Sequence, residues 1–304
     1  MSVRRKNKIR ISLGDRVFLA IVYLFLGLFV LTVVYPLIYV ISCSFSNPEA
    51  LVSGQVFFFP VDPGLQGYQA VLNNTKVWRA YGNTILYTVV GTVIGTSVTM
   101  MGAYVLSRKE FPLNGFLTAF FMFTMFFGGG TIPTYLIMKD LHLIDKIWAL
   151  VLPGAFSVWL AIVGRTFIKS SIPEEMFEAA SLDGCDYIRY FFKIILPLAK
   201  PILAVLALNF ALGQWNSYYG AMLYLNDSYK YPLQIVLREI LIQNTVDITN
   251  NTTGVDVNAT MQNQYLSELL KYSLIVISSI PLLCIYPFIQ KYFIKGVMVG
   301  SVKG

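Results

Sequence analysis

Residues 171–201 read SIPEEMFEAASLDGCDYIRYFFKIILPLAKP, a polar and charged stretch between two long apolar segments. Ser171 and Glu174 have the spacing of a capping box, and Pro173 suits the first turn of a helix, so a helix is expected to begin here. Gly184 can adopt the positive φ that ends such a helix. A second short helix with an apolar stripe follows. The stretch therefore predicts two short helices joined by a turn, which lie on a membrane surface and present acidic groups to a partner.

The composition excludes an ordinary soluble domain. The 304 residues are 56% hydrophobic and only 13% charged, and the mean hydropathy is +0.63. A net charge of +7 would suggest nucleic acid in a soluble protein, but in a membrane protein the placement of the charges matters more, so no nucleic-acid partner is expected. The three cysteines are widely separated and the single histidine has no cysteine nearby, so neither a disulfide framework nor a metal site is predicted.

Six apolar segments are long enough to cross a bilayer. They cover about residues 17–41, 84–106, 115–138, 147–168, 201–225 and 269–289. The first has no signal-peptide cleavage pattern and is interpreted as an uncleaved span. The predicted fold is an all-α integral membrane protein with six transmembrane helices. The chain divides into a basic N-terminus (1–16), a six-helix membrane domain (17–293) with an inner loop (171–201) and an outer loop (226–268), and a C-terminal tail (294–304).

The distribution of Lys and Arg sets the expected orientation. Sixteen of the 23 basic residues lie in segments on the same side as both termini. The other seven are Lys76, Arg79, Lys139, Lys146, Lys230, Arg238 and Lys271. Because cytoplasmic loops carry the excess of positive charge, both termini and the 171–201 loop are expected in the cytoplasm.

Glycines in the second and third spans predict particular packing. Gly91, Gly95 and Gly102 give the second span a small-residue face for close helix packing. The run 128–130 in the third span invites comparison with a phosphate loop, but the Lys followed by Ser or Thr is absent. A kinked or locally unwound helix that lines a cavity is the better interpretation.

Four stretches of the chain resemble one family. The EAA loop of the membrane subunits of ABC importers is matched in identity and spacing by Glu178, Ala179, Ala180, Gly184, Ile194, Leu196 and Pro197. Three further stretches resemble the maltose-type carbohydrate-uptake permeases, and within them the complex-oligosaccharide or lipoprotein-associated subfamily. They are GGGTIPTYLIMKDLHLID (128–145), NFALGQWNSYY (209–219) and GVMVGSVKG (296–304). An interfacial amphipathic loop is the plainer alternative for residues 171–201.

The resemblance implies a multi-pass protein of the bacterial plasma membrane that works with partners. These would be a second homologous permease chain, a dimer of ATP-binding cassette ATPase subunits, an external substrate-binding lipoprotein, and a sugar or oligosaccharide. No P-loop is present, so Mg-ATP is expected in the ATPase, no cofactor is expected in this chain, and the chain is not expected to be an enzyme. ATP-driven closure of the ATPase would move the helix of the 171–201 loop, the coupling helix, and switch a central cavity between outward and inward access.

The resemblance also suggests residue roles in the coupling helix. Glu178 would make a polar contact with the ATPase, and small residues would allow close backbone approach while larger apolar ones fill its cleft. The ATPase-coupling residues expected are therefore Met176, Phe177, Glu178, Ala179, Ala180 and Gly184. Glu174 and Glu175 could instead simply keep the surface solvated.

A sugar needs an aromatic ring for its C–H face and amides or hydroxyls for its hydroxyl groups. The fifth span supplies both kinds of group, and polar side chains within a span usually face a cavity. The candidate substrate-pathway residues are Asn209, Gln214, Trp215, Asn216, Tyr218 and Tyr219. The alternative is an interfacial aromatic belt with amides that pack helices together.

Two other classes of function fit the sequence less well. An ion-coupled secondary carrier acting without an ATPase should have an acidic residue poised within the membrane, and the predicted spans have almost none. A membrane enzyme is less favoured still, because no nucleophile, base or metal cluster is visible.

Overall fold

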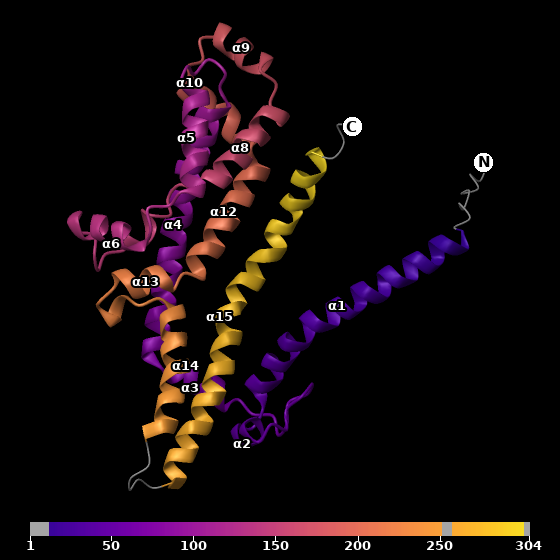
Figure 1. Cartoon of the computed structure of the whole chain (residues 1–304), viewed down its shortest axis with the longest axis vertical. Coiled ribbons are helices and arrows are strands. Elements are labelled where there is room, and N and C mark those ends of the chain that lie inside the picture. The colour runs from indigo at the N-terminus through magenta and orange to yellow at the C-terminus, as the bar shows by residue number, and fades with distance from the viewer. Residues whose placement is uncertain (1–11, 251–256, 301–304) are drawn as a thin grey trace. The chain divides into compact units, whose positions relative to one another are not determined.

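The computed structural model describes residues 12–250 and 257–300, and the regular structure in these residues is helical (Figure 1). The chain divides into two compact units, Met1–Val71 with Asp247–Val276, and Leu72–Val246 with Ile277–Gly304. Parts of the predicted N-terminus, outer loop and C-terminal tail, namely 1–11, 251–256 and 301–304, lie outside the described residues.

The first unit is built around α1. Its other elements are α2 (Pro48–Val52), most of α3 (Gln66–Asn73) and the first part of α15 (Val257–Gly300). A capping box between Ser12 and Asp15 starts α1 (Leu13–Phe45), whose 33 residues extend over about 50 Å. None of the most apolar window of α1 is buried within the chain, which is the exposure expected of a lipid-facing span. The C-terminal end of α1 joins a buried cluster of Cys43, Leu51, Val56 and Leu269.

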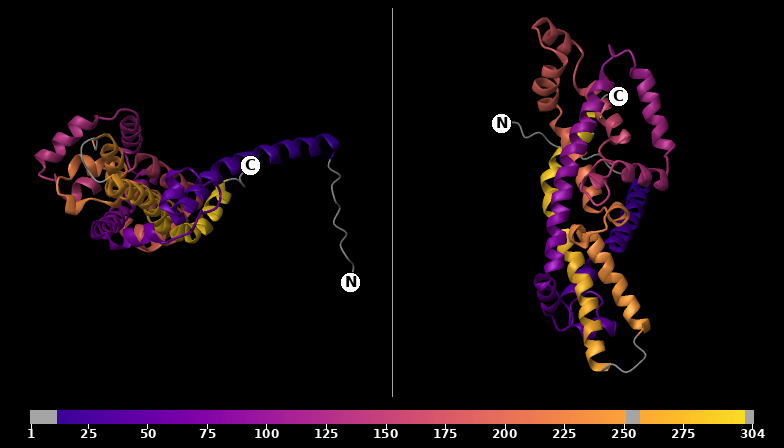
Figure 2. Two further views of the ribbon diagram at one scale, coloured as in Figure 1. Left: turned by 90° about the horizontal axis from the view of Figure 1, so that it is seen from below. Right: turned by 90° about the vertical axis from the view of Figure 1, so that its left-hand side faces the viewer.

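The second unit is organised around α4 (Thr75–Ser107). Its remaining elements in chain order are α5 (Asn114–Phe126), α6 (Thr131–Asp140), α7 (Trp148–Val151), α8 (Val158–Ser171), α9 (Glu175–Leu182), α10 (Tyr187–Tyr190), the π-helical η1 (Phe191–Ile195), α11 (Leu196–Leu198), α12 (Lys200–Trp215), α13 (Tyr219–Tyr224), the 3-10 helix η2 (Ser228–Lys230), most of α14 (Leu233–Asn250) and the end of α15. In this unit α9 and α10 lie at the end of α4 opposite to α14 (Figure 2).

Close packing of α4 follows the predicted glycine face. A Cβ atom added at Gly91 would lie 2.7 Å from the side chain of Gln214, and one at Gly95 would lie 2.5 Å from Cδ1 of Phe210. Both partners are on α12. A Cβ atom added at Gly102 would lie 2.6 Å from the ring of Phe156. The small-residue face is therefore confirmed, and it brings α12 and the segment before α8 against α4.

The predicted interruption of the third span is also confirmed. Residues 127–130 are not helical, and α5 and α6 meet at 112°. Gly130 has φ of +86°, which L side chains rarely adopt, so a glycine suits the bend.

The continuity predicted for the fourth and fifth spans is wrong. Residues 152–157 separate α7 from α8, because Pro153 and Gly154 disfavour helix and Ser157 accepts a hydrogen bond from the backbone N–H of Leu160 to start α8. The fifth span ends at Trp215, and α13 follows as a separate short helix.

The described residues contain three helices that are long and apolar enough to cross a membrane. They are Leu13–Phe45, Thr75–Ser107 and Ser267–Pro287. Two bent pairs raise the number to five if each pair is one span: α5 with α6, and Tyr187–Leu198 with Lys200–Trp215, which meet at 84°. The described residues thus have the all-helical structure of a membrane protein, with the predicted break in the third span and unpredicted breaks in the fourth and fifth.

Candidate functional sites

The first helix of the loop 171–201 begins differently from the prediction and ends as predicted. Ser171 is the last residue of α8, and no side chain caps α9 at Glu174. The predicted capping box is wrong because the carboxylate of Glu174 pairs with Lys109 instead. Gly184 has φ of +75°, and the N–H of Cys185 donates to the carbonyl of Ala180 at 2.9 Å. This is the left-handed C-terminal cap expected of a helix that stops at glycine.

Phe177 attaches α9 to the rest of its unit. Its side chain is buried, and its ring centroid lies 5.0 Å from those of both Tyr187 and Tyr190. The guanidinium carbon of Arg108, which directly follows α4, lies 4.1 Å from the Phe177 ring centroid and 5.0 Å from that of Tyr190. Such a desolvated cation–π stack is stronger than an exposed one. The expectation that Phe177 fills a partner's cleft is therefore corrected, because its ring is an internal contact.

The other predicted coupling residues divide between the surface and the core of the unit. Met176, Glu178 and Ala179 are exposed on α9, and Ala180 is half-buried against the hydrophobic core. The exposed Gly184 has no atom within 4 Å of where a Cβ would stand. The open face of α9 thus carries an acid, a small residue and a methionine, and a contact of these residues with an ATPase stays a prediction.

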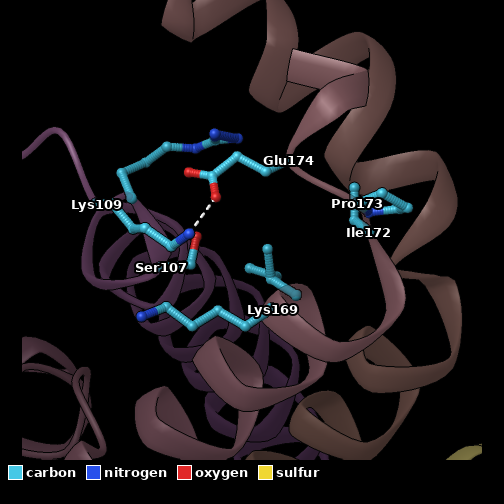
Figure 3. A pocket seen from close by; sticks show the side chains of 8 residues that line it. Ser107, Lys109, Lys169, Ile172, Pro173 and Glu174 are labelled. Carbon is cyan, nitrogen blue, oxygen red and sulfur yellow. Dashed lines mark hydrogen bonds and ion pairs between the residues drawn. The ribbon is translucent and has the colours of Figure 1, made fainter. Parts of the chain in front are cut away.

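A second link joins α9 to α4. Lys109 and Glu174 form an exposed ion pair (Figure 3). The hydrogen bond from Lys109 lowers the pKa of Glu174, and the same bond raises the pKa of Lys109. The residue before α9 is therefore held to the loop after α4 by charge, in addition to the ring stack.

A pocket of about 420 Å³ lies between the α7–α8 connection and α12. Two of the predicted pathway residues, Asn209 and Gln214, line it. Ser157, Ser217 and Trp159 line it as well, and 62% of the Trp159 side chain is exposed. Sequence reasoning missed Trp159 because the fourth span was interpreted as one straight helix. The Pro153–Gly154 break just before it is the signal that could have found it.

The other four predicted pathway residues lie elsewhere. Trp215 is only 4% exposed, and its Nε1 donates to the carbonyl of Ser278 at 3.1 Å. The amide of Asn216 donates to the carbonyl of Leu212 in its own helix at 2.9 Å. The hydroxyl of Tyr219 bonds Thr131 at 3.4 Å, and the guanidinium of Arg238 lies 5.7 Å from the ring centroid of Tyr218. Helix packing, part of the alternative interpretation of these residues, describes Trp215 better than a pathway does, whereas Asn216 is exposed and, among the described residues, bonds only within its own helix.

The arrangement defines a class of protein: a membrane transport subunit with broken helices, a polar pocket beside them and an acidic helix at one end of its larger unit. Residues 107–299 match the family model described as "Binding-protein-dependent transport system inner membrane component", and the chain belongs to this family. Its members are permease subunits of ABC importers and are not themselves enzymes, since a separate subunit hydrolyses ATP.

Similar proteins cover the whole length of the chain. Protein LplC of Bacillus subtilis (strain 168) is 40% identical over 292 residues, which are 96% of each chain. The polygalacturonan/rhamnogalacturonan transport system permease protein YtcP of the same organism is 37% identical over 290 residues, 95% of this chain and 99% of that one.

A solved structure agrees with these relatives. One chain in the crystal structure of a bacterial ABC transporter involved in the import of the acidic polysaccharide alginate superposes with a TM-score of 0.84 and 35% identity, over 94% of this chain and all of that chain. The protein is thus a permease subunit of an ABC importer, and these comparisons give no support to an ion-coupled carrier.

Proposed function

We propose that this chain is one of two permease subunits of a plasma-membrane importer that moves a sugar or oligosaccharide delivered by an external substrate-binding lipoprotein. YtcP is named for polygalacturonan and rhamnogalacturonan, and the solved transporter imports alginate. All three of these polysaccharides are built from sugar units. Mg-ATP would bind to the ATPase dimer that docks on α9, and not to this chain.

The observation that carries the coupling role is the attachment of α9. Its outer face is exposed, whereas its inner face is tied to the end of α4 by two separate contacts, the Arg108–Phe177 stack and the Lys109–Glu174 pair. A helix held this way transmits a displacement to α4, because packed elements move as bodies and do not deform continuously. We infer that α9 is the coupling helix.

The proposed topology has six spans with both termini in the cytoplasm. The spans would be α1, α4, the bent pair α5–α6, the broken pair α7–α8, α12 and the apolar part of α15. In this proposal the N-terminus (1–16) and the tail (294–304) flank a membrane domain (17–293), the loop 171–201 is cytoplasmic and the loop 226–268 is external. The excess of Lys and Arg in the inner segments supports this orientation.

The pocket beside α12 is the proposed part of the sugar pathway. Asn209, Gln214 and two serines offer hydrogen bonds to hydroxyl groups, and the exposed ring of Trp159 offers a face for a sugar ring. Among the described residues that line it, none is charged. The pocket therefore suits recognition of hydroxyl groups more than of carboxylates, which another subunit would have to recognise.

Charge reversal on α9 tests the proposal. Glu178→Lys should abolish ATP-coupled uptake in cells, because a lysine replaces an exposed carboxylate at the docking face, while the amount of protein in the membrane stays unchanged. Asp140→Lys is the matched control: it reverses an exposed charge at the C-terminal end of α6, where a cation suits the helix dipole. Uptake equal in the two variants would contradict the role of α9.

A further inference from the structure

A second pocket lies where α4 ends and where α8 leads into α9. Figure 3 shows this pocket from close by, and its volume is about 240 Å³. It is lined by Ser107, Arg108, Lys109, Ile168, Lys169, Ile172, Pro173 and Glu174. The coupling role uses contacts of Arg108, Lys109 and Glu174 within the chain, but neither it nor the sugar pathway assigns a ligand to this pocket.

The lining of this pocket has an excess of positive charge. Three cationic side chains, Arg108, Lys109 and Lys169, line it with one carboxylate, that of Glu174. Glu174 is paired with Lys109 and also acts on Arg108 and Lys169, so one carboxylate faces three cations and the lining keeps a net positive charge. Glu110 and Glu175 act on Lys109 more weakly, but neither lines the pocket.

Neighbouring cations repel the charge of Lys169. Burial lowers the pKa of its amine, the nearby charges of Arg165 and Lys109 lower the same pKa further, and Glu174 raises it. An anion in the pocket would relieve this repulsion. The pocket is therefore electrostatically prepared for a negative group.

Arg108 supplies a hydrogen-bond donor without an acceptor. Its side chain is only 9% exposed, and within the described residues its Nε atom has no hydrogen-bond partner. Aromatic rings approach the guanidinium, with the closest centroid at 4.1 Å, and the hydroxyl of Tyr104 also hydrogen-bonds the Arg108 side chain. These contacts leave Nε of Arg108 without an acceptor in the described part of the chain. A ligand with several acceptor oxygens would supply the acceptor that this donor lacks.

The position of the pocket indicates the source of such a ligand. α4 is long and apolar enough to cross a membrane, and the pocket lies at its C-terminal end. Basic pockets at the ends of membrane helices lie at the depth of lipid headgroups. We propose that this pocket binds a phosphate oxyanion, carried by the headgroup of an anionic phospholipid or present as free phosphate, with Arg108 and Lys169 as its main ligands. The proposal concerns a site beyond the transport role and requires no docking of an ATPase.

Lipid retention tests the site. The purified full-length chain would be placed in nanodiscs of phosphatidylcholine, with or without phosphatidylglycerol, and the lipids that stay bound after extraction would be counted by native mass spectrometry. Phosphatidylglycerol should be retained in preference to phosphatidylcholine. Lys169→Gln should lower this retention about fivefold, the effect of one basic residue near a membrane surface. Lys193→Gln, which removes an exposed lysine outside the pocket, is the matched control and should change nothing.

A second variant and a second ligand separate the sources. Arg108→Lys keeps the charge and loses the planar donor fork, so it should also weaken retention if the guanidinium contacts the phosphate. Inorganic phosphate could raise the unfolding temperature of the natural protein but not that of Lys169→Gln, while both lipids are retained equally. This result would support free phosphate as the ligand. Equal retention of both lipids with no phosphate effect would overturn the proposal. It would also be overturned if Lys169→Gln changed only co-purification with an ATPase subunit.

These measurements need no uptake. A chain that binds the oxyanion but tolerates Glu178→Lys would refute the coupling role and leave the site intact. A chain that fails to bind it but loses uptake in Glu178→Lys would refute the site alone.

Discussion

The loop 171–201 and the segment 209–219 are both short polar stretches that resemble family motifs, and the structure treats them differently. In the first, Glu178 and Ala179 of the motif are exposed on α9, Ala180 is half-buried, and Phe177 is buried against Arg108, far away in sequence. In the second, neighbours in sequence separate: Gln214 lines a pocket and Trp215 is buried against Ser278. A motif therefore identifies a segment, whereas distant neighbours decide which of its side chains are available.

The largest effect is expected at the end of α9. Gly184→Pro should abolish uptake, because proline fixes φ near −65° where the structure has +75°, and it removes an N–H that donates to the carbonyl of Ser181 at 3.0 Å. Gly184→Asn should retain most of the uptake, since asparagine tolerates the left-handed region. Transport assays on membranes with equal amounts of each variant compare the two. Full uptake in the proline variant would show that the turn after α9 does not transmit motion.

The second-largest effect is expected from replacing the two tryptophans of the pathway region, and it distinguishes their roles. Trp215→Ala should destabilise the protein by about 3 kcal/mol, because a buried ring and its bond to Ser278 are lost. Trp159→Ala should change stability by no more than about 0.5 kcal/mol, since its ring is mostly exposed, but should lower uptake. Thermal unfolding in detergent and an uptake assay give the two readouts. The reverse order of stabilities would mean that these two rings have been assigned the wrong roles.

The smallest effect is expected at the exposed pair before α9. Pairing with Lys109 lowers the pKa of Glu174 in the folded protein. Its contribution to stability is therefore present above the ordinary glutamate pKa and is lost as pH falls through the lowered folded value. The gap in unfolding temperature between the natural protein and Glu174→Gln should be small at neutral pH and vanish in acid. A gap that widens in acid would contradict the pairing.

Much of the fold could be predicted from the sequence where the signal is local. The apolar segments, the break at residues 127–130, the glycine face of α4 and the positive φ of Gly184 all follow from residue type and spacing. The same holds for the family, because the EAA spacing combines identities with position in the chain.

The errors have a common physical cause. The capping box at Ser171 failed because Lys109, more than sixty residues earlier, competes for Glu174. The prediction of a straight fourth span was wrong because hydropathy averages over Pro153 and Gly154, whose backbone preferences outweigh the apolar character of their neighbours. Phe177 is predicted at a docking face and Trp215 in a sugar pathway, and both are buried by contacts that no single segment of the sequence contains.

The account depends on α9 facing the cytoplasm, and labelling of Cys185, in the turn directly after α9, tests this most directly. In a variant with Cys43 and Cys284 replaced by serine, a membrane-impermeant maleimide should leave Cys185 unmodified in intact cells and label it in inside-out vesicles. Binding of the ATPase subunit to those vesicles should then protect it. Labelling of Cys185 from outside intact cells would place α9 on the wrong face of the membrane and contradict the coupling role.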